Sequence, residues 1–226
     1  MPGYEIKVQN LAIDGAADLR IRSLLDRQQF ADATGAAQAL GISTAQWPLF
    51  GQLWPSGLHL AAAMAVRPLP DGERILEIGC GLALASLVCH RRGGEVTASD
   101  IHPLAGAFLL ENLRLNALAP MRYCHGDWSA DAVAAAGGAP QVRGRFDLII
   151  GSDVLYERDD GGALAAFVDK HALARCELLI VDPNRGNRSA FGKRMAALGF
   201  EFSETLLSAE AGRPDYRGRL MRFARG

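Results

Sequence analysis

The sequence predicts an α/β protein with a doubly wound, mostly parallel sheet, and three features of the chain carry this prediction. From Glu73 onward, short apolar runs of strand character alternate with stretches of helical character. The first run leads into Glu77-Ile78-Gly79-Cys80-Gly81, and strand, glycine turn and helix form the ligand-binding corner of an open sheet. Residues 200–207 and 218–223 alternate like two strands of a hairpin, which indicates an antiparallel edge.

The elements follow one another in a regular order. Apolar runs predict strands at residues 73–79, 95–100, 121–127, 146–152 and 177–182. Helices are expected from Leu82, over about 104–116, over 159–171 and over 189–198, where Gly199 ends the last one. The turn of the final hairpin is expected to contain Gly212 and Pro214. Together these elements predict seven strands in one sheet.

The N-terminal part does not follow this alternation, so residues 1–45 are predicted to be an extension beside a main domain of residues 46–226. Tyr4–Leu11 is expected to be a strand, and Leu19–Phe30 an amphipathic helix, because apolar and charged residues are interleaved there. The extension is expected to lie across the sheet edge as a lid or flank.

Residues 47–57 contain two Trp-Pro pairs, at Trp47 and Trp54. Proline holds the preceding residue in an extended conformation, so a shaped loop with both tryptophans in non-helical backbone is expected. The tryptophans belong either to the core or to a loop that covers a ligand with an aromatic face.

The composition excludes several classes of protein. The 226 residues carry a formal net charge of −1, 49% are hydrophobic and 22% are charged, which fits one globular domain and gives no sign of nucleic-acid binding. Neither a signal peptide nor an apolar run of membrane-spanning length is evident, so a cytoplasmic protein is expected. The four cysteines and five histidines show no metal-ligand spacing, and buried reduced thiols are expected.

Three acids end three successive strands: Glu77, Asp100 and Asp127. The carboxyl edge of an open α/β sheet is where ligands bind. A carboxylate at Glu77 would repel the pyrophosphate of a dinucleotide, and Leu84 stands where a dinucleotide motif has its third glycine. S-adenosylmethionine fits better, because it has no phosphate and offers an ammonium, a sulfonium, a ribose diol and an adenine amine to such acceptors. Each of these acids could instead cap the helix that follows its strand.

These pieces resemble the seven-β-strand, Rossmann-like methyltransferases, and most closely the branch that contains protein-lysine methyltransferases. The likeness runs from about Trp54 to Leu198. It rests on Leu53-Trp54-Pro55, Leu76–Gly81, Ala98-Ser99-Asp100, Gly126-Asp127-Trp128, Phe146–Tyr156 and Val181–Arg185. The glycine motif is common to the superfamily, whereas Ser152–Tyr156 is more specific to the protein-lysine branch. One departure is Ala83, where many members carry a third glycine.

The resemblance implies a cofactor site for S-adenosylmethionine. Glu77, Gly79 and Gly81 would border its methionine end, Asp100 would accept from the ribose hydroxyls, and Asp127 would accept from the adenine amine beside Trp128. It further implies that Trp54, Cys80, Ile101 and Ser152 contact the cofactor. No metal is implied.

Asp153 and Tyr156 are the predicted catalytic residues. Their D-x-x-Y spacing is similar to that of amino-methylating enzymes, and the protein-lysine branch has it without intervening prolines. Asp153 would orient an amine and Tyr156 would close the site, because methyl transfer depends mostly on positioning. Asp182-Pro183-Asn184-Arg185 either lines the substrate mouth or forms an ordinary turn. Asp153 could also be structural, and Tyr156 a packed aromatic.

The function expected from these residues is an S-adenosylmethionine-dependent N-methyltransferase acting on a protein lysine. The alternatives are a methyltransferase for a small amine or other metabolite, and a cofactor-binding module without catalysis.

Overall fold

The computed structural model describes residues 3–129, 139–156, 159, 161–207 and 216–226. The predicted alternation is confirmed along the whole main domain. The strands are β1 (Ile6–Leu11), β2 (Leu19–Leu24), β3 (Arg74–Ile78), β4 (Glu95–Asp100), β5 (Arg122–His125), β6 (Phe146–Ser152), β7 (Ala172–Asp182), β8 (Glu201–Leu207) and β9 (Gly218–Arg225). The helices are α1 (Ala36–Ala39), the 3-10 helix η1 (Trp47–Gly51), α2 (Pro55–Val66), α3 (Leu84–Arg91), α4 (Ala105–Leu115), α5 (Ala163–His171) and α6 (Arg188–Ala197). The turn expected around Gly212 and Pro214 lies outside the described residues.

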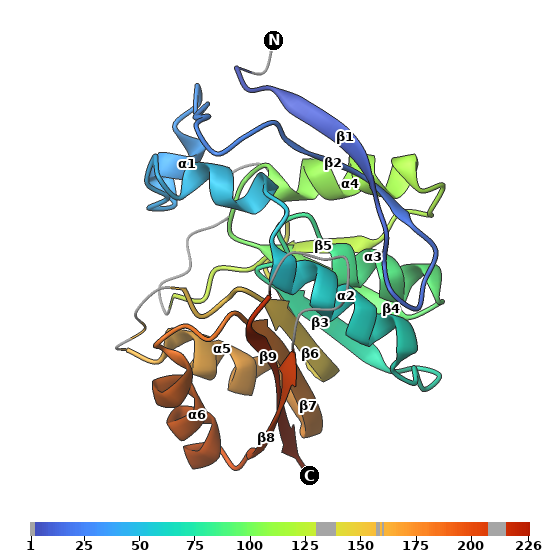
Figure 1. The fold of residues 1–226 in the computed structure, drawn as a ribbon. Helices are drawn as coiled ribbons and strands as arrows, with labels where there is room; N and C mark the ends of the chain where they lie inside the picture. The colour runs from blue at the N-terminus through green and yellow to red at the C-terminus, as the bar shows by residue number, and fades with distance from the viewer. Residues whose placement is uncertain (1–2, 130–138, 157–158, 160, 208–215) are drawn as a thin grey trace.

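The main sheet has seven strands in the order β5-β4-β3-β6-β7-β9-β8 (Figure 1). The strands β5, β4, β3, β6 and β7 are parallel, and β9 and β8 complete the sheet as an antiparallel edge. The chain winds outward from β3 through β4 to β5, and then returns to the other side of β3 with β6. The strand order therefore reverses between β3 and β6, which is where open α/β sheets bind ligands.

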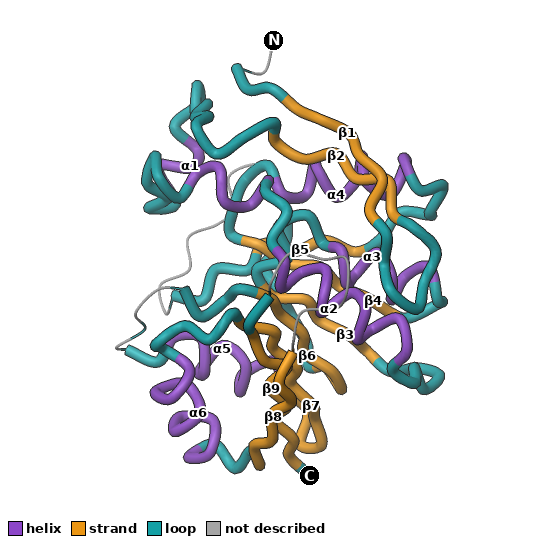
Figure 2. Tube along the Cα trace, in the orientation of Figure 1, coloured by secondary structure: helices purple, strands orange, loops and turns teal. Residues whose placement is uncertain are grey.

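Both faces of the central parallel strands are buried beneath helices, whereas the edge strand β8 is exposed. Leu76 and Ile78 of β3 belong to the core on the side of α5 and α6, whereas Ile75 packs with α2 and α3 on the other side. This alternation has the period of two expected of a strand. Figure 2 shows the same separation, with α5 and α6 grouped near β8 and β9 and away from α3 and α4. The apolar runs of these strands are nearly continuous because both faces are covered.

The N-terminal extension is a two-stranded antiparallel sheet, β1 and β2, that crosses over α4 (Figure 1). The helix expected over Leu19–Phe30 is wrong. Residues 19–24 form β2, in which Leu19 and Ile21 are buried and Arg20 between them is exposed. This alternation has the period of a strand, and pairing with β1 prevailed over the charge pattern that had indicated a helix.

Asn112 of α4 and Asn116, which caps the C-terminal end of that helix, hold this hairpin in place. Asn112 is fully buried, and its Oδ1 accepts a hydrogen bond from the backbone N of Arg22 at 2.8 Å. One turn further on, Asn116 accepts from the backbone N of Arg20 at 2.9 Å and donates to its carbonyl at 2.8 Å. The free edge of β2 is thereby satisfied by side chains of α4 rather than by another strand.

The loop expected over residues 47–57 is partly wrong. Trp47 begins the 3-10 helix η1, so only Trp54 has the extended backbone expected before a proline. Pro55 is the first residue of α2, a position that proline favours because its missing N–H would have no partner there. No helix in the described part of the chain is long and apolar enough to span a membrane.

The side chain of Asn112 gives a test of how the extension is held. Asn112→Ala should lower the free energy of unfolding by about 1–3 kcal/mol, because the buried N–H of Arg22 loses its acceptor. Urea denaturation measures the change. Glu111→Ala is the matched control on the same helix, and it should stay within about 0.5 kcal/mol because the salt bridge of Glu111 is to exposed Arg114. Equal effects of the two substitutions would show that Asn112 does not anchor the hairpin.

Candidate functional site

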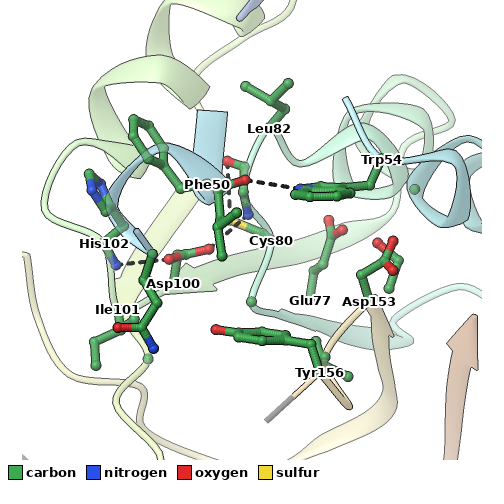
Figure 3. Close-up of a pocket in the computed structure, with 18 of the residues that line it drawn as sticks. Phe50, Trp54, Glu77, Cys80, Leu82, Asp100, Ile101, His102, Asp153 and Tyr156 are labelled. Atoms are coloured by element: carbon green, nitrogen blue, oxygen red, sulfur yellow. Dashed lines mark hydrogen bonds between the residues drawn. The ribbon is translucent and has the colours of Figure 1, made fainter. Parts of the chain in front are cut away.

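A cavity of about 450 Å³ opens at the carboxyl ends of β3, β4 and β6. A cavity of this size suits a small ligand. All twelve residues predicted for the site line it: Trp54, Glu77, Gly79, Cys80, Gly81, Asp100, Ile101, Asp127, Trp128, Ser152, Asp153 and Tyr156. In Figure 3 the carboxylate of Glu77 lies between the rings of Trp54 and Tyr156, with the carboxylates of Asp100 and Asp153 on either side of it. The structure thus brings the predicted residues together, and their roles toward a ligand stay predictions.

The glycine turn after β3 forms the floor of the cavity. Gly79 and Gly81 have φ values of 55° and 50°, in the left-handed region that favours glycine. A Cβ at Gly81 would lie 2.9 Å from the carbonyl oxygen of Phe50, so a larger residue does not fit. Ala83 also has a left-handed φ, of 57°. The alanine at this position is therefore strained by about 1–2 kcal/mol, which explains why glycine is common there in the family.

Glu77 is buried, and it holds the start of α3. Its Oε2 accepts a hydrogen bond from the backbone N of Ser86, in the first turn of that helix, at 2.8 Å. The N-terminal end of a helix favours a negative charge. Burial nevertheless raises the pKa of Glu77 from 4.5 to about 7, and the nearby charge of Asp100 adds to this. The carboxylate lines the cavity without an ion pair among the described residues, so it can accept a cation.

Asp100 ends β4 at the cavity and is buried, with 7% of its surface exposed. Its Oδ2 accepts from the backbone N of Gly81 at 2.8 Å, and its Oδ1 accepts from the backbone N of His102 at 2.8 Å. The acid therefore ties the end of β4 to the glycine turn. Burial raises the pKa of Asp100, and these backbone donors lower it. Each carboxylate oxygen has a second lone pair, which remains for a ligand hydroxyl.

Asp127 and Trp128 form the far wall, beyond the end of β5. The Oδ1 of Asp127 accepts from the backbone N of Ser129 at 2.8 Å, which forms a local turn, and the helix that this acid could cap would fall outside the described residues. Trp128 is half-buried, and its ring lies within 3.5 Å of a Cβ placed on Gly79. The Nε1 of Trp128 is buried and has no hydrogen-bond partner in the described part of the chain. A polar ligand atom in the cavity could satisfy it.

Asp153 follows β6 in a left-handed backbone conformation, with a φ of 58°. Its Oδ1 is 2.9 Å from the guanidinium of Arg185, and its Oδ2 has no hydrogen-bond partner among the described residues. Burial raises the pKa of Asp153, whereas Ser56 and Arg185 lower it. Tyr156 is 48% exposed at the mouth of the cavity, so it is not a packed core aromatic.

Both readings of residues 182–185 hold. Asp182 is fully buried, and its Oδ1 accepts from the backbone N of Arg185 at 2.7 Å, which forms an ordinary turn. Arg185, at the end of that turn, lines the cavity. Asp182 does not line the cavity, so of these two residues it is the arginine that faces it.

The two tryptophans have different positions. Trp47 is 1% exposed and packs in the core against Phe50 and His102. Trp54 borders the cavity, its Nε1 donates to the carbonyl of Leu49 at 2.9 Å, and the guanidinium of Arg27 lies 4.6 Å from its ring. The core reading thus holds for Trp47 and the cavity reading for Trp54.

Sequence reasoning missed Phe50 and His102, which stack at 3.7 Å and line the cavity beside Asp100. It also missed Leu40, Ile42 and Gln46, through which the N-terminal part reaches the cavity. No spacing motif marks these residues, because the tertiary fold alone brings them there. Burial lowers the pKa of His102 to about 3, so its ring is neutral near pH 7.

The four cysteines are free and buried, as expected. Among the described residues, no group of three histidine, cysteine, aspartate or glutamate side chains is placed to hold a metal ion.

The strand order, the glycine turn and the acids at the strand ends define a class of protein. The chain has the fold of the class I, Rossmann-like methyltransferases, and in sequence it is similar to curated protein methyltransferases. No protein-family model matches it. Its relatives include the electron transfer flavoprotein beta subunit lysine methyltransferase of Mus musculus, which is 26% identical over 141 residues, or 61% of this chain and 51% of the relative.

A second relative is the histone-arginine methyltransferase METTL23 of Rattus norvegicus, which is 29% identical over 120 residues, or 51% of each chain. The chain spans about half the length of these curated relatives. Among solved structures, magnesium protoporphyrin IX methyltransferase from Synechocystis with bound SAM has a TM-score of 0.57 at 20% identity, over 76% of this chain and 78% of that one. This likeness supports the fold.

The raised pKa of Glu77 gives a pH-dependent prediction. The folded protein favours the protonated acid, so this group stabilises the fold below pH 4.5, and the contribution is lost as the pH rises to about 7. Glu77→Gln removes this contribution, because the amide of glutamine does not titrate. The difference in unfolding free energy between variant and wild type should therefore shift in favour of the variant by about 3 kcal/mol across this window, at about 1.4 kcal/mol per pKa unit.

Urea denaturation without ligand at a series of pH values measures this difference. Glu95→Gln, at the exposed start of β4, is the control for loss of a carboxylate. A difference between Glu77→Gln and wild type that is independent of pH would contradict the raised pKa.

Proposed function

We propose that this chain transfers a methyl group from S-adenosylmethionine to an amine nitrogen, and that the amine is a lysine side chain of a protein. One observation carries the proposal. Asp153 and Tyr156 meet at the mouth of the same cavity whose floor is the glycine turn and whose walls carry Glu77 and Asp100. The residues proposed to meet the acceptor and those proposed to bind the cofactor thus line the same cavity.

The residues present fit the cofactor. The turn at Gly79 and Gly81 leaves no room for a Cβ, so its backbone can approach a ligand closely. Glu77 would accept from the ammonium, Asp100 from the ribose hydroxyls, and Asp127 from the adenine amine, while the unpartnered Nε1 of Trp128 offers a donor. The remaining contacts would come from Trp54, Cys80, Ile101 and Ser152. The bound cofactor supplies a methyl group on a positively charged sulfur.

The residues proposed to meet the acceptor orient its amine and do not deprotonate it. The carboxylate of Asp153, whose buried Oδ2 has no partner among the described residues, would accept a hydrogen bond from the amine and aim the nitrogen lone pair at the methyl group. Tyr156, half-exposed at the mouth, would close around the acceptor chain. No strong general base is required, because the neutral amine can be taken from solution.

The relatives support a protein substrate, since those named above are methyltransferases for protein lysine and protein arginine. A small amine or other metabolite is the alternative acceptor, and a module without catalysis is the reading from another class. We propose the cytoplasm as the compartment, because four buried free thiols suit a reducing environment.

Labelling tests the proposal. The purified chain, with a methyl-labelled donor and a cell lysate as the acceptor source, should label a protein band. Asp153→Asn keeps the size of the side chain and removes its charge. It should lower labelling by about 10-fold or more, at about 1.4 kcal/mol per factor of ten, while affinity for S-adenosylhomocysteine changes little.

Thermal stabilisation by S-adenosylhomocysteine measures the affinity of each variant. Label in small molecules alone would favour a metabolite acceptor, and no label at all would count against catalysis. Full labelling by Asp153→Asn would make Asp153 structural. Loss of S-adenosylhomocysteine binding in that variant would place Asp153 in the cofactor shell instead.

A further inference from the structure

Arg185 is the cation that faces the predicted acceptor site, and the sequence assigned it no more than a place at the substrate mouth. We propose that Arg185 is a positioning residue that cancels the charge of Asp153, so that the acceptor amine is held in its neutral, nucleophilic form. The inference rests on the proposed function.

The position of Arg185 is fixed at both ends. Its backbone N donates to Oδ1 of Asp182 at 2.7 Å, which sets the turn after β7. Its guanidinium contacts Oδ1 of Asp153 at 2.9 Å and the carbonyl oxygen of Asp153 at 3.2 Å. Asp153 is in the strained left-handed region, so the second contact also stabilises the turn that presents the acid.

The exposure of the pair shows which way it faces. The side chain of Asp153 is 11% exposed and that of Arg185 is 30% exposed, and both line the cavity. An ion pair this sheltered is screened less than one on the surface. The Oδ2 of Asp153 has no partner among the described residues. That oxygen is buried, so what the pair places at the cavity is a carboxylate whose charge is already compensated.

The other groups near Asp153 come from several elements. Asp182 of β7 adds a negative charge that raises the pKa of Asp153, and it is buried behind the pair. Ser56 of α2 shares a hydrogen bond of 2.8 Å with Tyr216, on which His59 stacks at 4.2 Å. Glu77 of β3 lines the same cavity. Among the described residues, several acids and one guanidinium line this corner, so it would hold an ammonium firmly if Arg185 were absent.

Methyl transfer requires the neutral amine and not the ammonium. An alkylammonium has no lone pair and must lose a proton to water before it can react. The nitrogen lone pair then forms the new N–C bond, the electron pair of the breaking C–S bond returns to sulfur, and the methylated nitrogen releases its extra proton to solvent. A guanidinium is always charged at accessible pH. It opposes a second cation beside it, and a like charge at about 4–6 Å lowers the pKa of such an amine by about 1–3 units.

The pH dependence of turnover tests the proposal. The acid limb of kcat reports groups in the complex with bound acceptor. Arg185→Gln should move this limb to higher pH by about 1–3 units, because the bound amine keeps its proton longer and Asp153 loses its counter-ion. Arg185→Lys keeps the charge and should keep the limb where wild type has it, even if turnover falls. Arg188→Gln, three residues further on and paired with Glu204 outside the cavity, is the matched control.

The acceptor for these measurements is the protein band that wild type labels, supplied at saturating concentration. Stabilisation by S-adenosylhomocysteine reports whether each variant is folded. An acid limb that does not move in folded Arg185→Gln, or turnover that no alkaline pH recovers, overturns the proposal. If Arg185→Gln does not fold, a displaced limb in folded Arg185→Lys overturns it and an unchanged limb supports it. Failure of wild type to label any amine counts instead against the proposed function.

Discussion

Two buried carboxylates, Glu77 and Asp100, hold the glycine turn on which the rest of the site depends. Glu77 satisfies a backbone N–H in the first turn of α3, and Asp100 satisfies the N–H groups of Gly81 and His102. Neither acid forms an ion pair within the described ranges. Burying an ionised carboxylate without a cation is unfavourable, and the raised pKa values of both groups express that cost. The turn is thus held by charges that a cationic ligand would stabilise.

The reversal of strand order between β3 and β6 sets the second half of the site against the first. Gly79 directly follows β3 and packs toward Val154, which immediately follows Asp153 after β6. A Cβ at Gly79 would lie 3.0 Å from the side chain of Val154. This close packing of Gly79 on Val154 sets the spacing between the glycine turn and Asp153. This suits a reaction in which positioning provides most of the rate.

The sequence was informative where local pattern and burial agree. Parallel strands covered on both faces appear as apolar runs, so β3, β4, β6 and β7 could be located, and with them the acids that end them. It was misleading for β2, where strand pairing and Asn112 decide the structure of an Arg-rich segment. Local pattern also could not show that Asp100 is buried, because its cover comes from the tertiary fold.

The contact between Arg185 and Asp153 could not be predicted from the sequence for a related reason. In sequence it belongs to a turn, and only the neighbouring strands β6 and β7 bring it against Asp153. Phe50 precedes β3 and His102 follows β4, yet their rings stack in the folded chain. Contacts between distant segments carry no spacing signal in a single chain, so they had to come from the structure.

The central claim is that the uncompensated acids of this cavity select the cationic cofactor. Calorimetric titration with S-adenosylhomocysteine near pH 7, in two buffers of different ionisation enthalpy, measures both affinity and proton exchange. The account predicts binding with release of part of a proton, because the ligand ammonium would favour the ionised form of Glu77, whose pKa without ligand is about 7. It also predicts that NAD gives no response. Binding of NAD without a response to S-adenosylhomocysteine would contradict the account, as would S-adenosylhomocysteine binding that exchanges no proton.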